Sequence, residues 1–136
     1  MEIEYRRFSK NDLWNLFTLS DDEWKGIHIE LVKSLLQAEG NIEQCFVAIS
    51  DDKLAGYICG FALPNGTLIP EFLYVLPEYR KHGIGKRLLC TLEENSGCCV
   101  SIIYYNNTLH DYYEKLGYSS GSNLEVAMKN IAASKG

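Results

Sequence analysis

Residues 71–89 join a strand-like segment to an amphipathic helix through a loop that contains two glycines. The apolar segment ends at Pro77, which cannot donate a hydrogen bond to a strand ladder. Ile84, Leu88 and Leu92 then recur at helical spacing, so the helix begins directly after the loop. A strand that feeds a helical crossover is a building step of α/β folds, because the helix packs back on the sheet.

The rest of the chain supplies further elements of such a fold. Capping-box spacings at Ser9, Ser20 and Thr108 predict helices, of which the second stops near Gly40 and the last ends at Gly117. Apolar alternation and turn signals predict strands at residues 2–8, 45–50, 54–63, 67–76, 98–104 (a buried one) and 123–130, with a short additional one near Tyr118.

Two turns and one proline indicate how the middle strands are connected. Residues 51–53 predict one turn, and residues 64–66 predict a hairpin whose Asn-Gly pair tolerates the positive φ angles of a type I′ turn. Pro70 lies inside the next strand and indicates an edge or a bulge. The element order predicts a mixed sheet, with an antiparallel meander followed by a helical crossover to a parallel strand.

Length and composition set broader limits. The 136 residues fit one domain over residues 1–136, and a formal net charge of -5 argues against nucleic-acid binding. There is no apolar run long enough to cross a membrane and no signal-peptide pattern, so a cytoplasmic location is expected. The odd number of cysteines without CxxC spacing favours reduced structural thiols over a disulfide or metal site at Cys45, Cys59, Cys90, Cys98 and Cys99.

The two-glycine loop has the features of a phosphate site. A helix N-terminus presents unpaired N–H groups and partial positive charge, and glycines allow a phosphate to approach the backbone. A P-loop would need Ser or Thr at Arg87, and a dinucleotide fingerprint would need a third glycine at Leu88. The pattern therefore predicts a diphosphate ligand of another kind, assisted by the basic residues Arg80, Lys81, Lys86 and Arg87.

The motif Arg80-x-x-Gly83-x-Gly85 resembles the acetyl-CoA-binding signature of the GNAT superfamily of N-acetyltransferases. Residues 113–118, which read Tyr-Glu-Lys-Leu-Gly-Tyr, resemble the end of the family's second motif, which Asn106 precedes, and residues 54–57 resemble its third strand. The chain departs from the family pattern at two positions, which are Leu109, where the family usually has Ala, and Pro70.

The resemblance implies a fold and a cofactor site. The fold would be α/β (α+β), with a mixed, mostly antiparallel central sheet flanked by about four helices and a splayed parallel strand pair at the cofactor site. Acetyl-CoA would be the co-substrate, with no metal. Main-chain groups of Leu73, Tyr74 and Val75 in the fourth strand would pair with pantetheine. Backbone amides from Lys81 to Lys86 would hold the diphosphate, and the side-chain amide of Asn106 would bind the cofactor near the strand–helix junction. The implied cofactor-binding residues are Leu73, Tyr74, Val75, Arg80, Lys81, His82, Gly83, Ile84, Gly85, Lys86 and Asn106.

The resemblance also implies two catalytic residues. Glu71 would accept the proton of the acceptor amine, directly or through water, and Tyr113 would protonate the leaving thiolate. The alternatives are a solvated strand residue for Glu71 and a core aromatic beside Leu109 and Leu116 for Tyr113. Simpler roles are expected for the histidines. We expect His82 to be a solvated loop residue, His28 to be structural or to line the acceptor cleft, and His110 to be exposed. The acidic residues 21–23 fit a helix N-terminus better than an acceptor site.

The expected function is transfer of an acetyl group to a primary amine of a small molecule or a protein, by direct attack in a ternary complex. The alternative is a catalytically silent sensor or interaction module that binds acyl-CoA. Neither nucleic acid nor membrane is an expected partner, and a homodimer is possible. The acceptor is not encoded in any motif described above.

Overall fold

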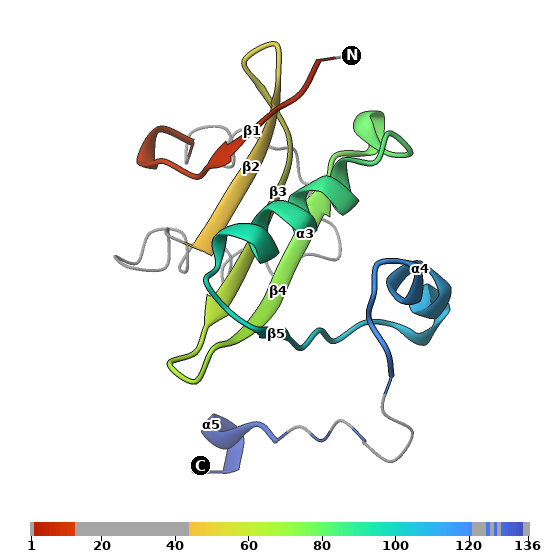
Figure 1. Ribbon diagram of the computed structural model, residues 1–136. Coiled ribbons are helices and arrows are strands. Elements are labelled where there is room, and N and C mark those ends of the chain that lie inside the picture. The colour runs from red at the N-terminus through yellow and green to blue at the C-terminus, as the bar shows by residue number, and fades with distance from the viewer. Residues whose placement is uncertain (1, 13–43, 121–124, 126, 128, 135–136) are drawn as a thin grey trace. The chain divides into compact units, whose positions relative to one another are not determined.

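The computed structural model describes residues 2–12, 44–120, 125, 127 and 129–134. The chain divides into two compact units, Met1–Tyr104 and Tyr105–Gly136, which are described separately below (Figure 1). The helices expected after Ser9 and Ser20, together with His28 and the acidic residues 21–23, lie outside the described residues except for the first turn after Ser9. One domain over residues 1–136 stays a prediction.

The first unit is built around a five-stranded mixed sheet in the order β1-β2-β3-β4-β5. The first four strands are antiparallel neighbours, and β5 is parallel to β4. The predicted α/β fold with a mixed, mostly antiparallel sheet and a parallel strand pair is thereby confirmed. The strands are β1 (Glu4–Arg7), β2 (Cys45–Ser50), β3 (Lys53–Ala62), β4 (Thr67–Val75) and β5 (Val100–Ser101).

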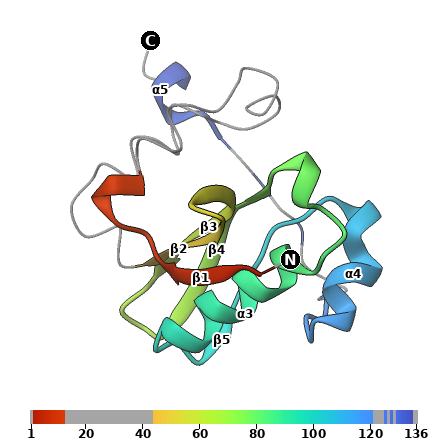
Figure 2. The ribbon, with the colours of Figure 1, turned by 90° about the horizontal axis from the view of Figure 1, so that it is seen from above.

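Helix α3 (Ile84–Asn95) lies across one face of this sheet (Figures 1 and 2). The side chains of Leu88 and Leu92 in this helix are fully buried against β3. A Cβ atom on Gly56 would lie 3.3 Å from Leu88 Cδ1 and 2.7 Å from the carbonyl oxygen of Tyr74. The glycine in β3 therefore lets helix and strand approach closely, a role that the sequence pattern did not reveal.

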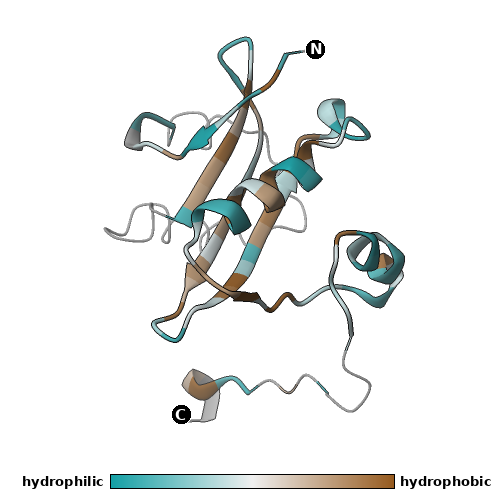
Figure 3. Cartoon of the chain, in the orientation of Figure 1, coloured by the Kyte–Doolittle hydropathy of each residue, from teal (hydrophilic) through white to brown (hydrophobic). Residues whose placement is uncertain are grey.

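The opposite face of the sheet carries a second apolar cluster. Cys45 and Val47 on β2 lie opposite Cys59 and Tyr57 on β3, and all four side chains are buried. Because both faces of β2 and β3 are covered, these strands are apolar at almost every position, as the hydropathy colouring shows (Figure 3). Burial was predicted for the thiols in apolar runs and is found for Cys45 and Cys59, whereas Cys99 is exposed.

The two hairpins differ from each other in turn chemistry. Asp51 and Asp52 have φ angles of 48° and 64°, so the two-residue loop between β2 and β3 has the two positive φ angles of a type I′ turn. The type I′ prediction for residues 64–66 is wrong. The Gly66 N–H donates to the Leu63 carbonyl at 3.0 Å, and only Gly66 has a positive φ in that loop. Because proline has a fixed negative φ, Pro64 favours a type I turn closed by a left-handed glycine.

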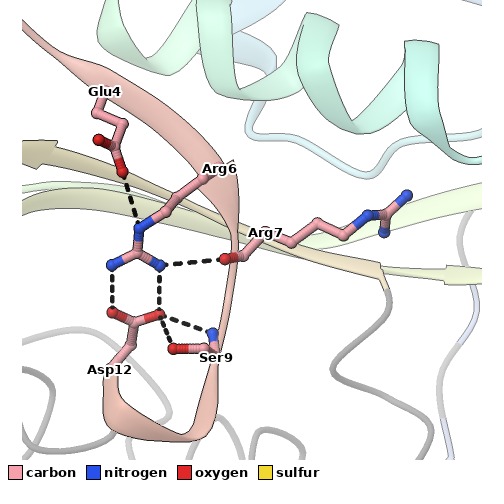
Figure 4. A network of polar contacts seen from close by, with 5 residues as sticks. All are labelled: Glu4, Arg6, Arg7, Ser9 and Asp12. Carbon is pink, nitrogen blue, oxygen red and sulfur yellow. Dashed lines mark hydrogen bonds and ion pairs between the residues drawn. The ribbon is translucent and has the colours of Figure 1, made fainter.

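The end of β1 is held by a buried carboxylate (Figure 4). Arg6 donates from both Nη atoms to the two oxygens of Asp12 at 2.8 Å, and the Ser9 N–H donates to the same carboxylate at 2.7 Å. The hydrogen bond from the Ser9 N–H to the Asp12 carboxylate is the one that the capping-box spacing predicted. The Asp12 side chain is 3% exposed, so the pair with Arg6 is shielded from water on the carboxylate side.

The strand predicted at residues 98–104 is much shorter and less buried than expected. Only Val100 and Ser101 join the ladder, opposite Thr67 and Leu68. Val100 is 57% exposed and Ile102 is 48% exposed, which corrects the prediction of a buried strand. An apolar run indicates that a strand can form, but burial depends on partners that lie elsewhere in the chain.

The second unit contains the 3-10 turn η4 (Asn107–Leu109) and the helices α4 (His110–Lys115) and α5 (Ile131–Ser134). Gly117 has a φ of 96°, and the Tyr118 N–H reaches back to the Tyr113 carbonyl at 3.1 Å. This Schellman arrangement confirms Gly117 as the residue that ends the helix. No strand forms near Tyr118 or at the described residues among 123–130; the remaining residues of that range lie outside the description.

Candidate functional site

The loop between β4 and α3 presents backbone N–H groups at a helix N-terminus. After the 3-10 turn η3 (Pro77–Tyr79), Lys81 and Gly83 have φ angles of 67° and 78°. Gly83 is the N-cap of α3, and no described side chain caps the helix. The first N–H groups of α3 are therefore available to an anion, and left-handed residues in the loop help to form a concave nest of N–H groups.

The two glycines of the loop differ in what they contribute. The φ of 78° at position 83 is one that favours glycine, and nothing lies within 4 Å of the position that a Cβ atom would take there. Gly85 is the second residue of α3 and has no positive φ. Backbone conformation therefore explains glycine at 83 and does not explain glycine at 85.

The basic side chains around the loop have different environments. The Arg80 Nε donates to the Val75 carbonyl at 2.9 Å, and its guanidinium lies 5.5 Å from the centre of the Tyr74 ring. Arg80 therefore fixes the corner between β4 and the loop, and Arg87 lies 5.8 Å above the Tyr5 ring. The exposed side chains left near the loop, and so free to turn toward an anion, are those of Lys81, His82 and Lys86.

Strand β4 has main-chain groups that do not face β3. The Leu76 N–H donates to the Ala55 carbonyl at 2.9 Å, and alternate residues of an antiparallel strand face the same neighbour. The N–H and C=O groups of Tyr74 therefore also face β3, whereas the N–H and C=O groups of Leu73 and Val75 point to the other side. Of the three residues predicted to pair with the cofactor through their main chain, Leu73 and Val75 direct those groups away from β3, whereas Tyr74 does not.

The parallel neighbour of β4 covers only the start of the strand. Strand β5 pairs with Thr67 and Leu68, and the ladder between described residues ends there. Further along, the register between β3 and β4 shifts so that Gly60 faces Pro70 and Cys59 faces Phe72. Glu71 is the extra, exposed residue of this bulge. Both the splay of β5 and the bulge beside Pro70 were predicted, and both are present.

Asn106 and Tyr113 belong to the second unit and are described within it. The Asn106 side chain accepts a hydrogen bond from the Thr108 N–H at 3.0 Å, so Asn106 caps the element and the prediction that Thr108 does so is wrong. Its amide NH₂ is not used in this cap. Tyr113 is 7% exposed, and burial raises the pKa of its phenol, with a smaller contribution from Tyr112. The phenol therefore stays protonated at neutral pH and can donate a proton.

The packing around Tyr113 comes from other tyrosines. The Tyr105 ring lies 4.7 Å from the Tyr113 ring between centres, and Tyr112 and Tyr118 meet it edge-on at 5.0 and 6.0 Å. Leu109, the expected apolar neighbour, is 44% exposed. These ring contacts were missed because a sequence does not show which aromatic residues meet.

Sequence reasoning also missed the contacts of His110. This side chain was expected to be exposed, but it is only partly so and pairs with Glu114 at 2.9 Å. The spacing of four residues on a helix was the available signal.

Among the described residues, no group of three or more side chains is arranged to hold a metal ion. No helix within the same residues is long and apolar enough to cross a membrane.

Comparison with protein families gives one match that spans most of the described core. The model of the acetyltransferase (GNAT) domain matches residues 41–120, which include β2–β5, the two-glycine loop, α3 and α4. No curated protein sequence matches the chain.

Solved structures with a similar fold include several acetyltransferases. AAC(6')-Iy in complex with the bisubstrate analogue CoA-S-monomethyl-acetylneamine has a TM-score of 0.71 at 20% identity, with 96% of this chain and 100% of that chain covered. A ribosomal-protein-alanine N-acetyltransferase from Brucella melitensis biovar Abortus has a TM-score of 0.70 at 16% identity, with 96% and 99% covered.

A third relative contains both an acceptor and the coenzyme. The diaminobutyrate acetyltransferase from Paenibacillus lautus, in complex with L-2,4-diaminobutyric acid and coenzyme A, has a TM-score of 0.64 at 21% identity, with 85% of this chain and 72% of that chain covered. At these identities the likeness establishes the fold of the chain and not its acceptor.

Proposed function

The chain belongs to the GNAT acetyltransferase family, and on that premise we propose that it transfers an acetyl group from acetyl-CoA to a primary amine by direct attack in a ternary complex. The observation that carries this proposal is the edge of β4 at Leu73 and Val75, which pairs with no described strand on the side away from β3, next to the N-terminus of α3, which no described side chain caps. An extended amide chain that ends in a diphosphate fits this pair of features.

The two features suit different parts of acetyl-CoA. The N–H and C=O groups of Leu73 and the N–H group of Val75 would pair with the pantetheine amides as an added strand does, because the Val75 carbonyl already accepts a hydrogen bond from Arg80 Nε. The N–H groups between Lys81 and Lys86 would bind the diphosphate, and the exposed basic side chains there would offset its charge. The free NH₂ of Asn106 would donate to a carbonyl of the coenzyme. Tyr74 packs beneath Arg80 and holds the corner between these two regions.

The reaction needs two proton transfers. An amine of the lysine type has a reference pKa near 10.4, so about one molecule in a thousand or fewer is neutral at pH 7. Glu71 would accept the proton, directly or through water, as the amine nitrogen bonds to the thioester carbonyl carbon. Tyr113 would give its proton to the sulfur as the carbon–sulfur bond breaks. The exposure of Glu71 and the protonated state of Tyr113 suit these roles.

The acceptor is proposed as a primary amine of a small molecule or a protein. The names of the three structural relatives refer to an aminoglycoside-type analogue, a ribosomal protein alanine and diaminobutyrate. All three are amines, but they differ in size and charge, so the proposal stops at the amine class. Location in the cytoplasm and a homodimer remain predictions.

A thiol-release assay tests the proposal. Free CoA is measured with a disulfide dye while acetyl-CoA is mixed with sisomicin, L-2,4-diaminobutyrate or a peptide with an N-terminal alanine, and Tyr113→Phe is the matched variant. Thiol release with at least one amine, above acetyl-CoA hydrolysis alone, would support the proposal. Acetyl-CoA binding without amine-dependent release would favour a silent acyl-CoA sensor, and absence of binding would refute the proposed site.

A further inference from the structure

A chain of three polar side chains lies in the second unit outside the residues assigned above. The Tyr105 hydroxyl lies 3.3 Å from His110 Nδ1, and His110 Nε2 lies 2.9 Å from a carboxylate oxygen of Glu114. Tyr105 and His110 also line an open depression of about 600 Å³, together with Asn107, Thr108, Asp111 and Ser120. Both contacts of the imidazole are therefore made inside this unit, at the edge of solvent.

The carboxylate determines which way these hydrogen bonds run. An ionised carboxylate can only accept, so Nε2 of His110 must carry the hydrogen that faces Glu114. In a neutral imidazole Nδ1 is then an acceptor, and the Tyr105 hydroxyl donates to it. The side chains of His110 and Glu114 are 42% and 65% exposed, so the pair adds little to stability. Its consequence is the orientation of Tyr105.

Tyr105 is in contact with the proposed general acid. Its ring lies 4.7 Å from that of Tyr113 between centres, at an interplanar angle of 31°. Tyr112 and Tyr118 are nearly perpendicular to Tyr113, at interplanar angles of 83° and 85°. Of these three neighbours, Tyr105 has the shortest distance between ring centres and is the most nearly parallel, so its position limits how Tyr113 can rotate.

We propose that His110, held by Glu114, is a positioning residue that fixes Tyr105 and, through the contact between the two rings, the phenol of Tyr113. This inference rests on the proposed role of Tyr113 as the general acid. A proton donor that is misplaced by about an ångström loses much of its effect on the chemical step. Loss of the contact should therefore lower kcat and leave the KM for acetyl-CoA nearly unchanged.

Two substitutions of His110 separate its two hydrogen bonds. In His110→Asn the amide oxygen takes the place of Nδ1 and can still accept from Tyr105. In His110→Gln the amide group reaches the place of Nε2, which keeps the contact with Glu114 and loses the one with Tyr105. We expect roughly a threefold to tenfold loss of kcat in His110→Gln and in Tyr105→Phe, and a loss within about twofold in His110→Asn.

A measurement independent of turnover tests the hydrogen-bond direction. Two-bond ¹⁵N–¹H correlation spectra at alkaline pH should show His110 with hydrogen on Nε2 and a bare Nδ1, with the signal assigned by its loss in His110→Asn. A hydrogen on Nδ1 would overturn the proposal. Equal kcat values in wild type, Tyr105→Phe and His110→Gln would also overturn the proposal, provided that the wild type shows amine-dependent thiol release. A wild type without amine-dependent thiol release would instead refute the proposed function, and this inference with it.

Discussion

At the scale of single residues, the two proposed proton-transfer groups have opposite environments. Glu71 is exposed at the bulge of β4, whereas Tyr113 is 7% exposed among other tyrosines. A base that meets a solvated amine needs access to water, and a donor to a thiolate must keep its proton at neutral pH. The phenol of Tyr113 meets the second need, because its ordinary pKa near 10 already keeps it protonated at neutral pH and burial raises that pKa further.

The hydroxyl of Tyr113 can be removed while its ring is kept. Tyr113→Phe should keep the fold and acetyl-CoA affinity and lower kcat by about tenfold to a thousandfold, since general-acid help is lost. Steady-state kinetics with chemistry limiting would measure this. Tyr112→Phe is the control, because Tyr112 is 40% exposed on a different side of α4. If Tyr113→Phe had the rate of wild type, Tyr113 would have only a packing role.

Glu71→Gln should lower turnover near neutral pH with little change in acetyl-CoA affinity. The defect should shrink as the pH rises toward the pKa of the acceptor, because a neutral amine needs no base. A pH–rate profile of wild type and variant with the same amine would measure it. A loss of equal size at every pH would indicate a structural role for Glu71 at the bulge.

At the scale of elements, the loop before α3 depends on one backbone conformation. Gly83→Val would place a branched side chain at a φ of 78°, which costs roughly 1–3 kcal/mol of folding free energy. Gly97 is a matched control, since its φ is 73°, nothing lies within 4 Å of its Cβ position, and it follows α3 rather than preceding it.

Both variants should lose similar stability, but Gly83→Val alone should weaken acetyl-CoA binding. Thermal unfolding and isothermal titration calorimetry would measure the two effects. Equal acetyl-CoA affinity in Gly83→Val and Gly97→Val would mean that the loop is not the diphosphate site.

The junction between β1 and the turn that follows depends on Asp12. Burial by itself raises the pKa of this carboxyl, but hydrogen bonds from Arg6 and Ser9 and the charge of Arg6 outweigh burial and hold the pKa below its usual value. Ionised Asp12 therefore stabilises the fold above about pH 4, and this stabilisation is lost as the pH falls through the lower pKa of the folded state.

Asp12→Asn should lower the free energy of unfolding by about 1.5–3 kcal/mol at pH 7. The difference from wild type should decrease as the pH is lowered below 4, because the wild-type carboxyl is then protonated as well. Denaturant unfolding at a series of pH values would measure this, and a pH-independent difference would contradict it.

At the scale of the whole molecule, acetyl-CoA should stabilise the folded chain against heat. A ligand that binds only the folded state adds about 2.7 kcal/mol at 100 times its dissociation constant. NAD and ATP should have little effect, because the loop lacks the third glycine of a dinucleotide site and the Ser or Thr of a P-loop. A thermal-shift experiment with each ligand would decide, and no shift with millimolar acetyl-CoA would argue against the proposed site.

Local spacing in the sequence was sufficient for much of this molecule. The order of β1–β4, the helix after the glycine loop, the bulge beside Pro70 and the end of α4 at Gly117 were all predicted and are present. Each depends on residues within a few positions of one another, through side-chain alternation, capping or the missing N–H of proline. The family signature lies in the same kind of short, continuous segment.

Tertiary structure alone decided which groups meet across the chain. The length and exposure of β5 depend on how many of its residues pair with β4. The apolar run at 98–104 contains no information on the extent of this pairing. The contacts of Arg80 with the end of β4 and of His110 with Tyr105 could not be predicted, because these partners become close only after folding. The sequence by itself determined the elements and the family, whereas pairing between distant residues determined the edges, the burial and the contacts of the site, since those energies exist only once the partners are packed together.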